Sequence, residues 1–232
     1  PVSRPVTLSG LGKLSSRGSE QPLAVNVGIL GGTFDPVHLG HLSIASSAMD
    51  QAALEKILFI PAGQPRLKRS EPSASVDHRQ EMVRLAILDI PNYQVCDIEA
   101  HRPGPTYSVD TLVELSDKLG PSADLFFILG LDVLGQLDRW KEPERVLELC
   151  QLLVLNRPGE QDFDWTGFYG RIPEAKNRVQ VVIAPLVDVS ATDLRNRASA
   201  GEPLEGQVPD AVAEYIRQQG LYLTAGEGRT AN

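Results

Sequence analysis

The most informative run of this sequence is Gly31-Gly32-Thr33-Phe34-Asp35-Pro36-Val37-His38-Leu39-Gly40-His41. It follows a short apolar run, residues 24–30, that predicts a buried strand, and it precedes residues 42–54, which predict a helix. A strand, a glycine turn and a helix in this order bring phosphate oxygens to backbone N–H groups at a helix N-terminus. The paired glycines add no Cβ, so the backbone can approach an anion closely.

The two histidines of this run strengthen the indication of a phosphate site. His38 and His41 lie three residues apart at the start of the predicted helix, so their rings share one face. Each ring can donate an N–H to a phosphate oxygen, and the helix dipole adds partial positive charge there. The alternative is a plain glycine turn with two solvent-facing histidines, which leaves their pairing unexplained. The run therefore predicts a site that handles nucleotides.

Composition limits the other classes of function. The chain has 232 residues, 42% hydrophobic and 22% charged, which suits one α/β domain with a large core. A net charge of −8 and a pI near 5.0 argue against a partner that is a nucleic acid or an anionic membrane, but they allow a small anionic substrate. The two cysteines, Cys96 and Cys150, show no C-x-x-C spacing, and no apolar run is long enough to span a membrane. We expect no metal site of the protein's own and a cytoplasmic location.

Strands alternate with helices along the chain, and most strands are apolar throughout. This predicts a doubly wound, Rossmann-like parallel sheet with its ligand at the carboxyl ends of the strands. The expected domain covers residues 23–223, between a disordered N-terminal extension, 1–22, and a disordered tail, 224–232. The predicted strands are residues 24–30, 56–61, 93–98, 124–130, 151–155 and 179–184, and the predicted helices are residues 42–54, 76–90, 108–119, 143–149, 190–198 and 209–219. Residues 158–177 have no clear period.

Two segments after the first motif lie where such a fold places its ligand. The loop after the second strand, residues 61–69, carries Arg66, Lys68 and Arg69, which either neutralise phosphates or form a solvated basic loop. Residues 105–112 put hydroxyls at a helix start, where they either cap the helix or contact a ligand. We place Ser108 at the N-cap of that helix, with Val109, Leu112, Val113 and Leu115 facing the core.

Two later segments extend the pattern. Asp132 follows a buried strand, a position that suits a ribose hydroxyl or a metal, and Trp140 either stacks on an aromatic base or fills the core. Ser190 and Asp193 have the spacing of a capping box, while Ser190, Thr192 and Arg195 together also suit a triphosphate.

Taken together, these segments resemble the bacterial nicotinate-nucleotide adenylyltransferase family, whose H-x-G-H motif defines the nucleotidylyltransferase superfamily. The resemblance covers roughly residues 25–223. It rests on residues 31–41, 61–68, 106–112, 129–140 and 190–195, and on the family-like ending at residues 215–222. Several ordered motifs over this length are far more specific than any one of them.

The resemblance implies an enzyme that joins nicotinic acid mononucleotide to ATP, giving nicotinic acid adenine dinucleotide and pyrophosphate, with Mg²⁺ carried on ATP. The implied catalytic residues are His38, His41, Lys68 and Arg195. The implied ATP site comprises Gly31, Gly32, Thr33, Phe34, His38, His41, Asp132, Ser190, Thr192 and Arg195. The implied nicotinate-nucleotide site comprises Gly32, Thr33, Phe34, Lys68, Thr106, Tyr107 and Trp140. The resemblance is also compatible with a homo-oligomer.

One segment departs from the family pattern. Many members carry Pro-Pro-His-Lys in the loop where this chain has Pro65-Arg66-Leu67-Lys68, so one contact to the substrate is lost and the role of Lys68 is less secure. Pantetheine-phosphate adenylyltransferase and glycerol-3-phosphate cytidylyltransferase share the first motif but lack the Leu-Gly-x-Asp…Trp element. The remaining alternatives are an enzyme that prefers nicotinamide mononucleotide and a non-catalytic nucleotide sensor on the same fold.

Overall fold

The computed structural model describes residues 24–63, 73–156 and 163–223, and its centre is a six-stranded sheet in the order β3-β2-β1-β4-β5-β6. Every neighbouring pair of strands is parallel. The strands are β1 (Val25–Gly32), β2 (Lys56–Pro61), β3 (Tyr93–Val95), β4 (Ala123–Gly130), β5 (Gln151–Asn156) and β6 (Val179–Ile183). This order reverses direction between β1 and β4, which makes that point the expected ligand crevice of the sheet.

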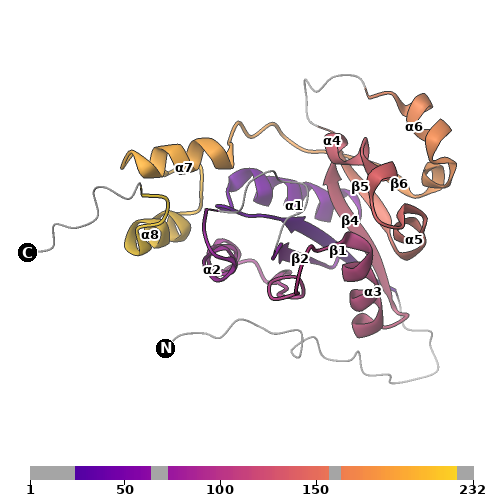
Figure 1. Ribbon diagram of the computed structural model, residues 1–232, viewed down its shortest axis with the longest axis horizontal. Helices are drawn as coiled ribbons and strands as arrows, with labels where there is room; N and C mark the ends of the chain where they lie inside the picture. The colour runs from indigo at the N-terminus through magenta and orange to yellow at the C-terminus, as the bar shows by residue number, and fades with distance from the viewer. Residues whose placement is uncertain (1–23, 64–72, 157–162, 224–232) are drawn as a thin grey trace, which may run out of the picture.

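Helices cover both faces of the sheet (Figure 1). The helices are α1 (Leu39–Gln51), α2 (Val76–Ala86), α3 (Ser108–Leu119), α4 (Leu131–Leu134), α5 (Pro143–Leu149), α6 (Trp165–Arg171), α7 (Ala191–Ser199) and α8 (Asp210–Gln219), with short 3₁₀ helices η2 (Leu137–Arg139) and η3 (Pro173–Asn177). One core contains residues of α1, α2, α7 and α8, and the other contains residues of α3 to α6. The predicted doubly wound fold is therefore confirmed.

The strands belong to both cores because successive side chains of a strand point to opposite faces. In β2, Ile57 and Phe59 lie in the core that contains α1, whereas Leu58 and Ile60 lie in the core that contains α3. All four are buried. This burial on both faces explains why the strands read as continuous apolar runs in the sequence.

Several predicted boundaries were wrong. Helix α1 begins at Leu39, three residues before the prediction, because His38 is its N-cap in an extended conformation. The predicted helix 76–90 ends at Ala86, and the predicted strand 93–98 ends at Val95, where its pairing with β2 stops. The N-cap of α3 is Tyr107 rather than Ser108, and Val113, expected in the core, is 37% exposed. Residues 165–171, for which no period was found, form α6.

Some predictions lie outside the described residues. These are the disordered extension 1–22, the tail 224–232 and most of the basic loop with Lys68. Within the described part of the chain, no helix is both long and apolar enough to cross a membrane.

Candidate active site

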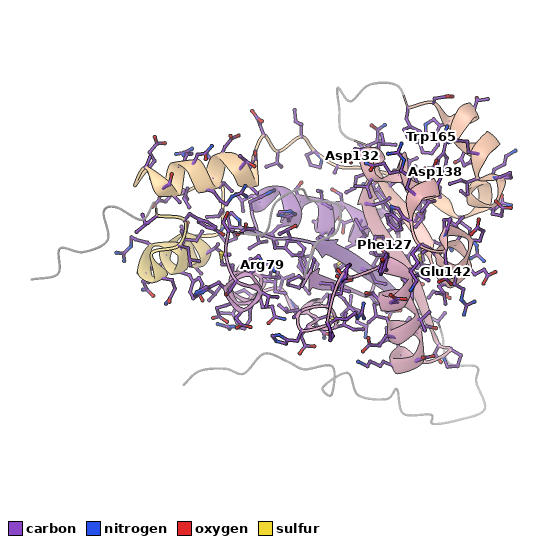
Figure 2. The ribbon with its side chains drawn as sticks, in the orientation of Figure 1. Arg79, Phe127, Asp132, Asp138, Glu142 and Trp165 are labelled. Carbon is purple, nitrogen blue, oxygen red and sulfur yellow. The ribbon has the colours of Figure 1, made fainter. Side chains whose placement is uncertain are left out.

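The predicted motif lies at the point where the strand order reverses. Gly31 and Gly32 end β1, and β4 ends at Gly130, directly before the short helix that carries Asp132. Figure 2 shows Asp132 at this end of the sheet, above Phe127 on β4. The carboxyl ends of β1 and β4 thus bring together two segments that are about a hundred residues apart in sequence.

The two histidines form a stacked pair at the N-terminus of α1. Their ring centroids lie 3.8 Å apart with an interplanar angle of 31°. The backbone N–H of His38 donates to Nδ1 of His41 over 3.2 Å. Because Nδ1 accepts this hydrogen bond, Nε2 is the nitrogen of His41 that carries a hydrogen and can donate it onward. The helix start therefore presents a fixed N–H donor beside the positive end of the helix dipole.

The glycine between the histidines allows the His38 ring to pack closely on the backbone. A Cβ at Gly40 would lie 3.0 Å from both Cε1 and Nδ1 of that ring, so the ring would have to move by a few tenths of an ångström to accommodate it. The same position is 4.0 Å from Cβ of Val187, in the segment that leads to α7. The glycine in the spacing His-x-Gly-His thus lets the histidine pair and the segment that precedes α7 pack closely against the start of α1.

Thr33 and Phe34 are buried next to the histidines. The two residues are 8% and 2% exposed. The Phe34 ring packs edge-on against His41, with centroids 5.0 Å apart, and also against Phe59. Phe34 has a φ of 50°, which turns the chain from β1 toward the histidines. These side chains support the site from below, and any contact of theirs with a nucleotide has to be made by the main chain.

Helix α7 meets the first motif through Arg195. Its Nη1 donates to the backbone oxygen of Asp35 over 2.8 Å, and its Nη2 donates to the hydroxyl of Thr192 over 3.2 Å. Ser190 is the N-cap of the helix, and its hydroxyl accepts the N–H of Asp193 over 3.4 Å. The structure therefore supports the capping interpretation of Ser190. It also brings Thr192 and Arg195 to the turn that precedes His38.

A buried arginine that sequence reasoning missed holds this turn in place. Arg79 of α2 is 1% exposed and donates to the carbonyl oxygens of Thr33 (2.8 Å), Ala62 (2.7 Å), Ala74 (3.2 Å) and Gly63 (3.3 Å). Burial lowers the pKa of its guanidinium, and the charge of Asp35 opposes that shift. Figure 2 shows Arg79 beneath the sheet end, on α2.

The carboxylate of Asp35 completes this support. It is 4% exposed and accepts the backbone N–H groups of Ser73 and Ala74 over 2.8 and 3.1 Å. The hydroxyl of Tyr222 donates to it over 2.9 Å, and burial together with this neighbouring carboxylate raises the pKa of Tyr222. Asp35 thus joins the motif to the segment before α2 and to the C-terminal end of the described chain. Asp35 belongs to the motif that predicts the phosphate site, but residue type and spacing alone indicate no role for its carboxylate.

Three of the residues predicted to bind the nicotinate nucleotide, Thr106, Tyr107 and Trp140, line one cavity. It has a volume of about 330 Å³ and is lined by Thr106, Tyr107, Ser108, Gln136, Arg139, Trp140 and Lys141. Trp140 is half-buried and packs edge-on against Phe127 of β4, with ring centroids 5.7 Å apart. Phe127 is also the nearest side chain to a Cβ placed at Gly31, at 3.9 Å. Phe127, another residue that sequence reasoning missed, therefore lies between the glycine turn and this cavity.

The cavity wall has its own buried support. Glu99 accepts a hydrogen bond of 2.7 Å from the hydroxyl of Thr111 and is also hydrogen-bonded to Thr106. Burial raises the pKa of Glu99, and these two hydroxyls oppose the shift. Arg102 donates to Thr111 over 2.9 Å. This network fixes the chain just before α3, where Thr106 and Tyr107 face the cavity.

Two other predicted site residues, Asp132 and Lys68, are not placed in the histidine cluster or the cavity lining by the structure. The Asp132 side chain is exposed in the first turn of α4, and Lys68 lies outside the described residues. In the described segments, no cluster of three or more His, Cys, Asp or Glu side chains is arranged to hold a metal ion. A larger cavity of about 630 Å³ lies between α7 and α8, and none of the predicted site residues lines it.

Comparison with known proteins agrees with this fold. Residues 29–197 match the family model described as cytidylyltransferase-like. The solved structure of a nicotinic acid mononucleotide adenylyltransferase from Plasmodium falciparum, complexed with NaAD, superimposes with a TM-score of 0.67 at 18% identity, over 85% of this chain and 97% of that one. A putative nicotinate-nucleotide adenylyltransferase from Vibrio parahaemolyticus gives a TM-score of 0.58 at 20% identity, over 85% and 95% of the two chains. The fold and the family model define the class: this is a protein of the cytidylyltransferase-like family.

Sequence relatives narrow the class further. A probable nicotinate-nucleotide adenylyltransferase of Roseiflexus sp. is 43% identical over 84% of this chain and 97% of that protein. A protein of the same description from Thermomicrobium roseum is 41% identical over 85% of this chain and 92% of its own length. The chain belongs to the nicotinate-nucleotide adenylyltransferase family, and the resemblance inferred from the sequence is confirmed.

Proposed function

We propose that this protein transfers the adenylyl group of ATP to nicotinic acid mononucleotide, forming nicotinic acid adenine dinucleotide and pyrophosphate. The observation that carries the proposal is the pairing of two sites at one sheet end. The histidine pair at the N-terminus of α1 suits phosphates, and Phe127 lies between the glycine turn and the cavity of Thr106, Tyr107 and Trp140. Family membership supplies the identity of the substrates.

The chemistry needs no covalent intermediate on the protein. An oxygen of the mononucleotide's 5′-phosphate attacks the α-phosphorus of ATP, a new P–O bond forms, and the bond to the bridging oxygen of pyrophosphate breaks in line. Negative charge grows on that leaving oxygen and on the non-bridging oxygens. Donors that are already oriented toward these positions stabilise the transition state. Nε2–H of His41 and the ring of His38 are such donors, and both lie at the positive end of the α1 dipole.

The leaving pyrophosphate needs a second group of donors. Thr192 and Arg195 lie beside the turn that precedes the histidines, because Arg195 is anchored on the backbone oxygen of Asp35. The hydrogen bonds of Nη1 and Nη2 thus fix the position of the guanidinium, and its remaining N–H groups are assigned to the β- and γ-phosphates. Mg²⁺ bound to ATP would neutralise part of the same charge. Lys68 is assigned to a phosphate on the resemblance alone.

The cavity is assigned to the pyridine ring. Trp140 and Tyr107 offer aromatic faces, and a volume of about 330 Å³ suits one heteroaromatic ring with part of its ribose. The ring would lie next to Phe127, which connects the cavity to the glycine turn and hence to the phosphates.

Pyrophosphate release tests this proposal. Wild-type protein is incubated with ATP, Mg²⁺ and either nicotinic acid mononucleotide or nicotinamide mononucleotide. We expect turnover with the acid, and we expect His41→Ala to lower kcat by at least a hundredfold. The matched control is His101→Ala, which removes an exposed histidine near Asp77 and leaves kcat unchanged. Preference for the amide would overturn the assigned substrate, and ATP binding without release from either substrate would support the nucleotide sensor.

Trp140→Ala separates the two halves of the site. We expect a raised KM for the mononucleotide with the KM for ATP nearly unchanged, because Trp140 lines the cavity and not the histidine cluster. An unchanged KM for the mononucleotide would return the Trp140 ring to a purely core-filling role.

A further inference from the structure

The described lining of the nicotinate cavity contains basic side chains and no acidic ones, on a protein that is negative overall. Its lining includes Arg139 and Lys141, and among the described residues that line it there is no aspartate or glutamate. The whole chain carries a net charge of −8. The two basic side chains of the lining thus contrast with the negative net charge of the chain, and they favour a ligand that places negative charge at the cavity.

Lys141 is an exposed side chain that an ion pair restrains at this cavity. It directly follows Trp140, and its ammonium lies 5.0 Å from the centroid of the Tyr107 ring. Asp110 of α3 holds it with an ion pair of 2.8 Å, and this hydrogen bond raises the pKa of Lys141, so the group is charged at neutral pH. Asp110 does not line the cavity. The ion pair thus positions the cation beside an aromatic ring of the cavity wall and keeps its counter-ion outside.

The two pyridine mononucleotides differ where such a charge matters. Nicotinate and nicotinamide have nearly the same size and shape, and both offer an oxygen that backbone N–H groups can bind. Only nicotinate carries a full negative charge on the ring substituent. Both carry the same phosphate, so contributions from the phosphate cancel when the two substrates are compared. A fixed cation therefore discriminates between them where size and hydrogen bonding do not.

We propose that Lys141, held in place by Asp110, is a specificity-determining residue that makes the cavity select nicotinate over nicotinamide. This inference rests on the proposed function, whose site it refines. A charge pair separated by roughly 6 Å at an effective dielectric constant of about 40 to 80 corresponds to a preference of about three- to tenfold. Any further preference for nicotinate over nicotinamide comes from other groups of the cavity.

The test compares kcat/KM for the two mononucleotides across three variants. Lys141→Met removes the cation and keeps the length of the side chain. Asp110→Asn removes the counter-ion, so its effect has the opposite sign. The matched control is Lys118→Met, which removes an equal charge from an exposed ion pair with Glu114, ten residues or about 15 Å along α3 from Ser108.

We expect Lys141→Met to lower kcat/KM for the acid about three- to tenfold and to leave the value for the amide within twofold. Asp110→Asn should raise the ratio of acid to amide, and Lys118→Met should change neither substrate. Equal loss with both substrates, or no loss with the acid, would overturn the role of Lys141. If the wild-type protein turns over neither substrate, the proposed function fails, and calorimetric affinities for the two mononucleotides in the same variants then decide whether Lys141 selects the acid.

Discussion

Replacing Arg79 by methionine should destabilise the protein more than any single change at the surface. The guanidinium is 1% exposed and donates to four carbonyl oxygens. The two shorter hydrogen bonds, at 2.7 and 2.8 Å, contribute about 1.5 kcal/mol each. The two longer ones contribute about 0.5 kcal/mol each. The expected loss in the free energy of unfolding is therefore about 4 kcal/mol, because methionine fills the space but leaves these carbonyls without a donor.

Urea denaturation followed by circular dichroism measures this loss. In thermal unfolding, the same loss should lower the Tm of a protein of this size by about 8 to 16 °C. Arg84→Met is the matched control on the same helix, since Arg84 is partly exposed and forms an ion pair with Glu81. We expect that control to cost less than about 1 kcal/mol. If Arg79→Met yields no soluble protein, Arg79→Lys, which keeps the charge but reaches fewer carbonyls, should lose about half as much. A loss below about 1 kcal/mol for Arg79→Met would refute the idea that Arg79 supports the motif.

Three further outcomes follow from single contacts. Gly40→Ala should lower kcat at least tenfold, because the added methyl displaces the His38 ring. The free energy of unfolding should change by less than about 1 kcal/mol, because alanine favours the helix. Steady-state kinetics and urea denaturation measure the two effects. Tyr222→Phe, which removes a buried hydrogen bond to a carboxylate, should cost about 1.5 to 3 kcal/mol in urea melts, and a loss within error would contradict it. Burial raises the pKa of Cys96 to about 11 and of Cys150 to about 12, so at pH 8 both thiols should react with DTNB only after unfolding, and rapid labelling of the native protein would count against this.

The sequence predicts the sheet well because its signals are local. Apolar runs such as residues 56–61 mark strands that are buried on both faces, and the glycine run at the end of β1 marks the turn into α1. Helix boundaries depend on contacts that periodicity does not show. Helix α1 starts early because His38 caps it, and Val113 matches the apolar period of α3 yet stays partly exposed.

The residues of the candidate site also fall into those that local sequence signals indicate and those that depend on tertiary packing. The histidines were found because residue type and spacing alone indicate phosphate chemistry. Arg79 escaped notice because it lies in the polar segment His78-Arg79-Gln80-Glu81, and only tertiary packing buries its guanidinium. Phe127 escaped because it is one apolar residue in an apolar strand, and its place beside the glycine turn comes from the pairing of β4 with β1. The roles assigned to individual residues toward each substrate stay predictions that the proposed kinetics address.

An acidic protein can bind two anionic substrates because its net charge and the cations of its candidate site act over different distances. The net charge of −8 is the sum over the whole chain, and salt at physiological strength screens its effect beyond about 8 Å. The cations of the site act within a few ångströms: Arg195 beside the histidine turn, and Arg139 and Lys141 at the cavity. A polyanion such as DNA meets mainly the repulsive surface, whereas a small nucleotide reaches the cations. The same protein is therefore expected to reject nucleic acids and to bind ATP with a mononucleotide.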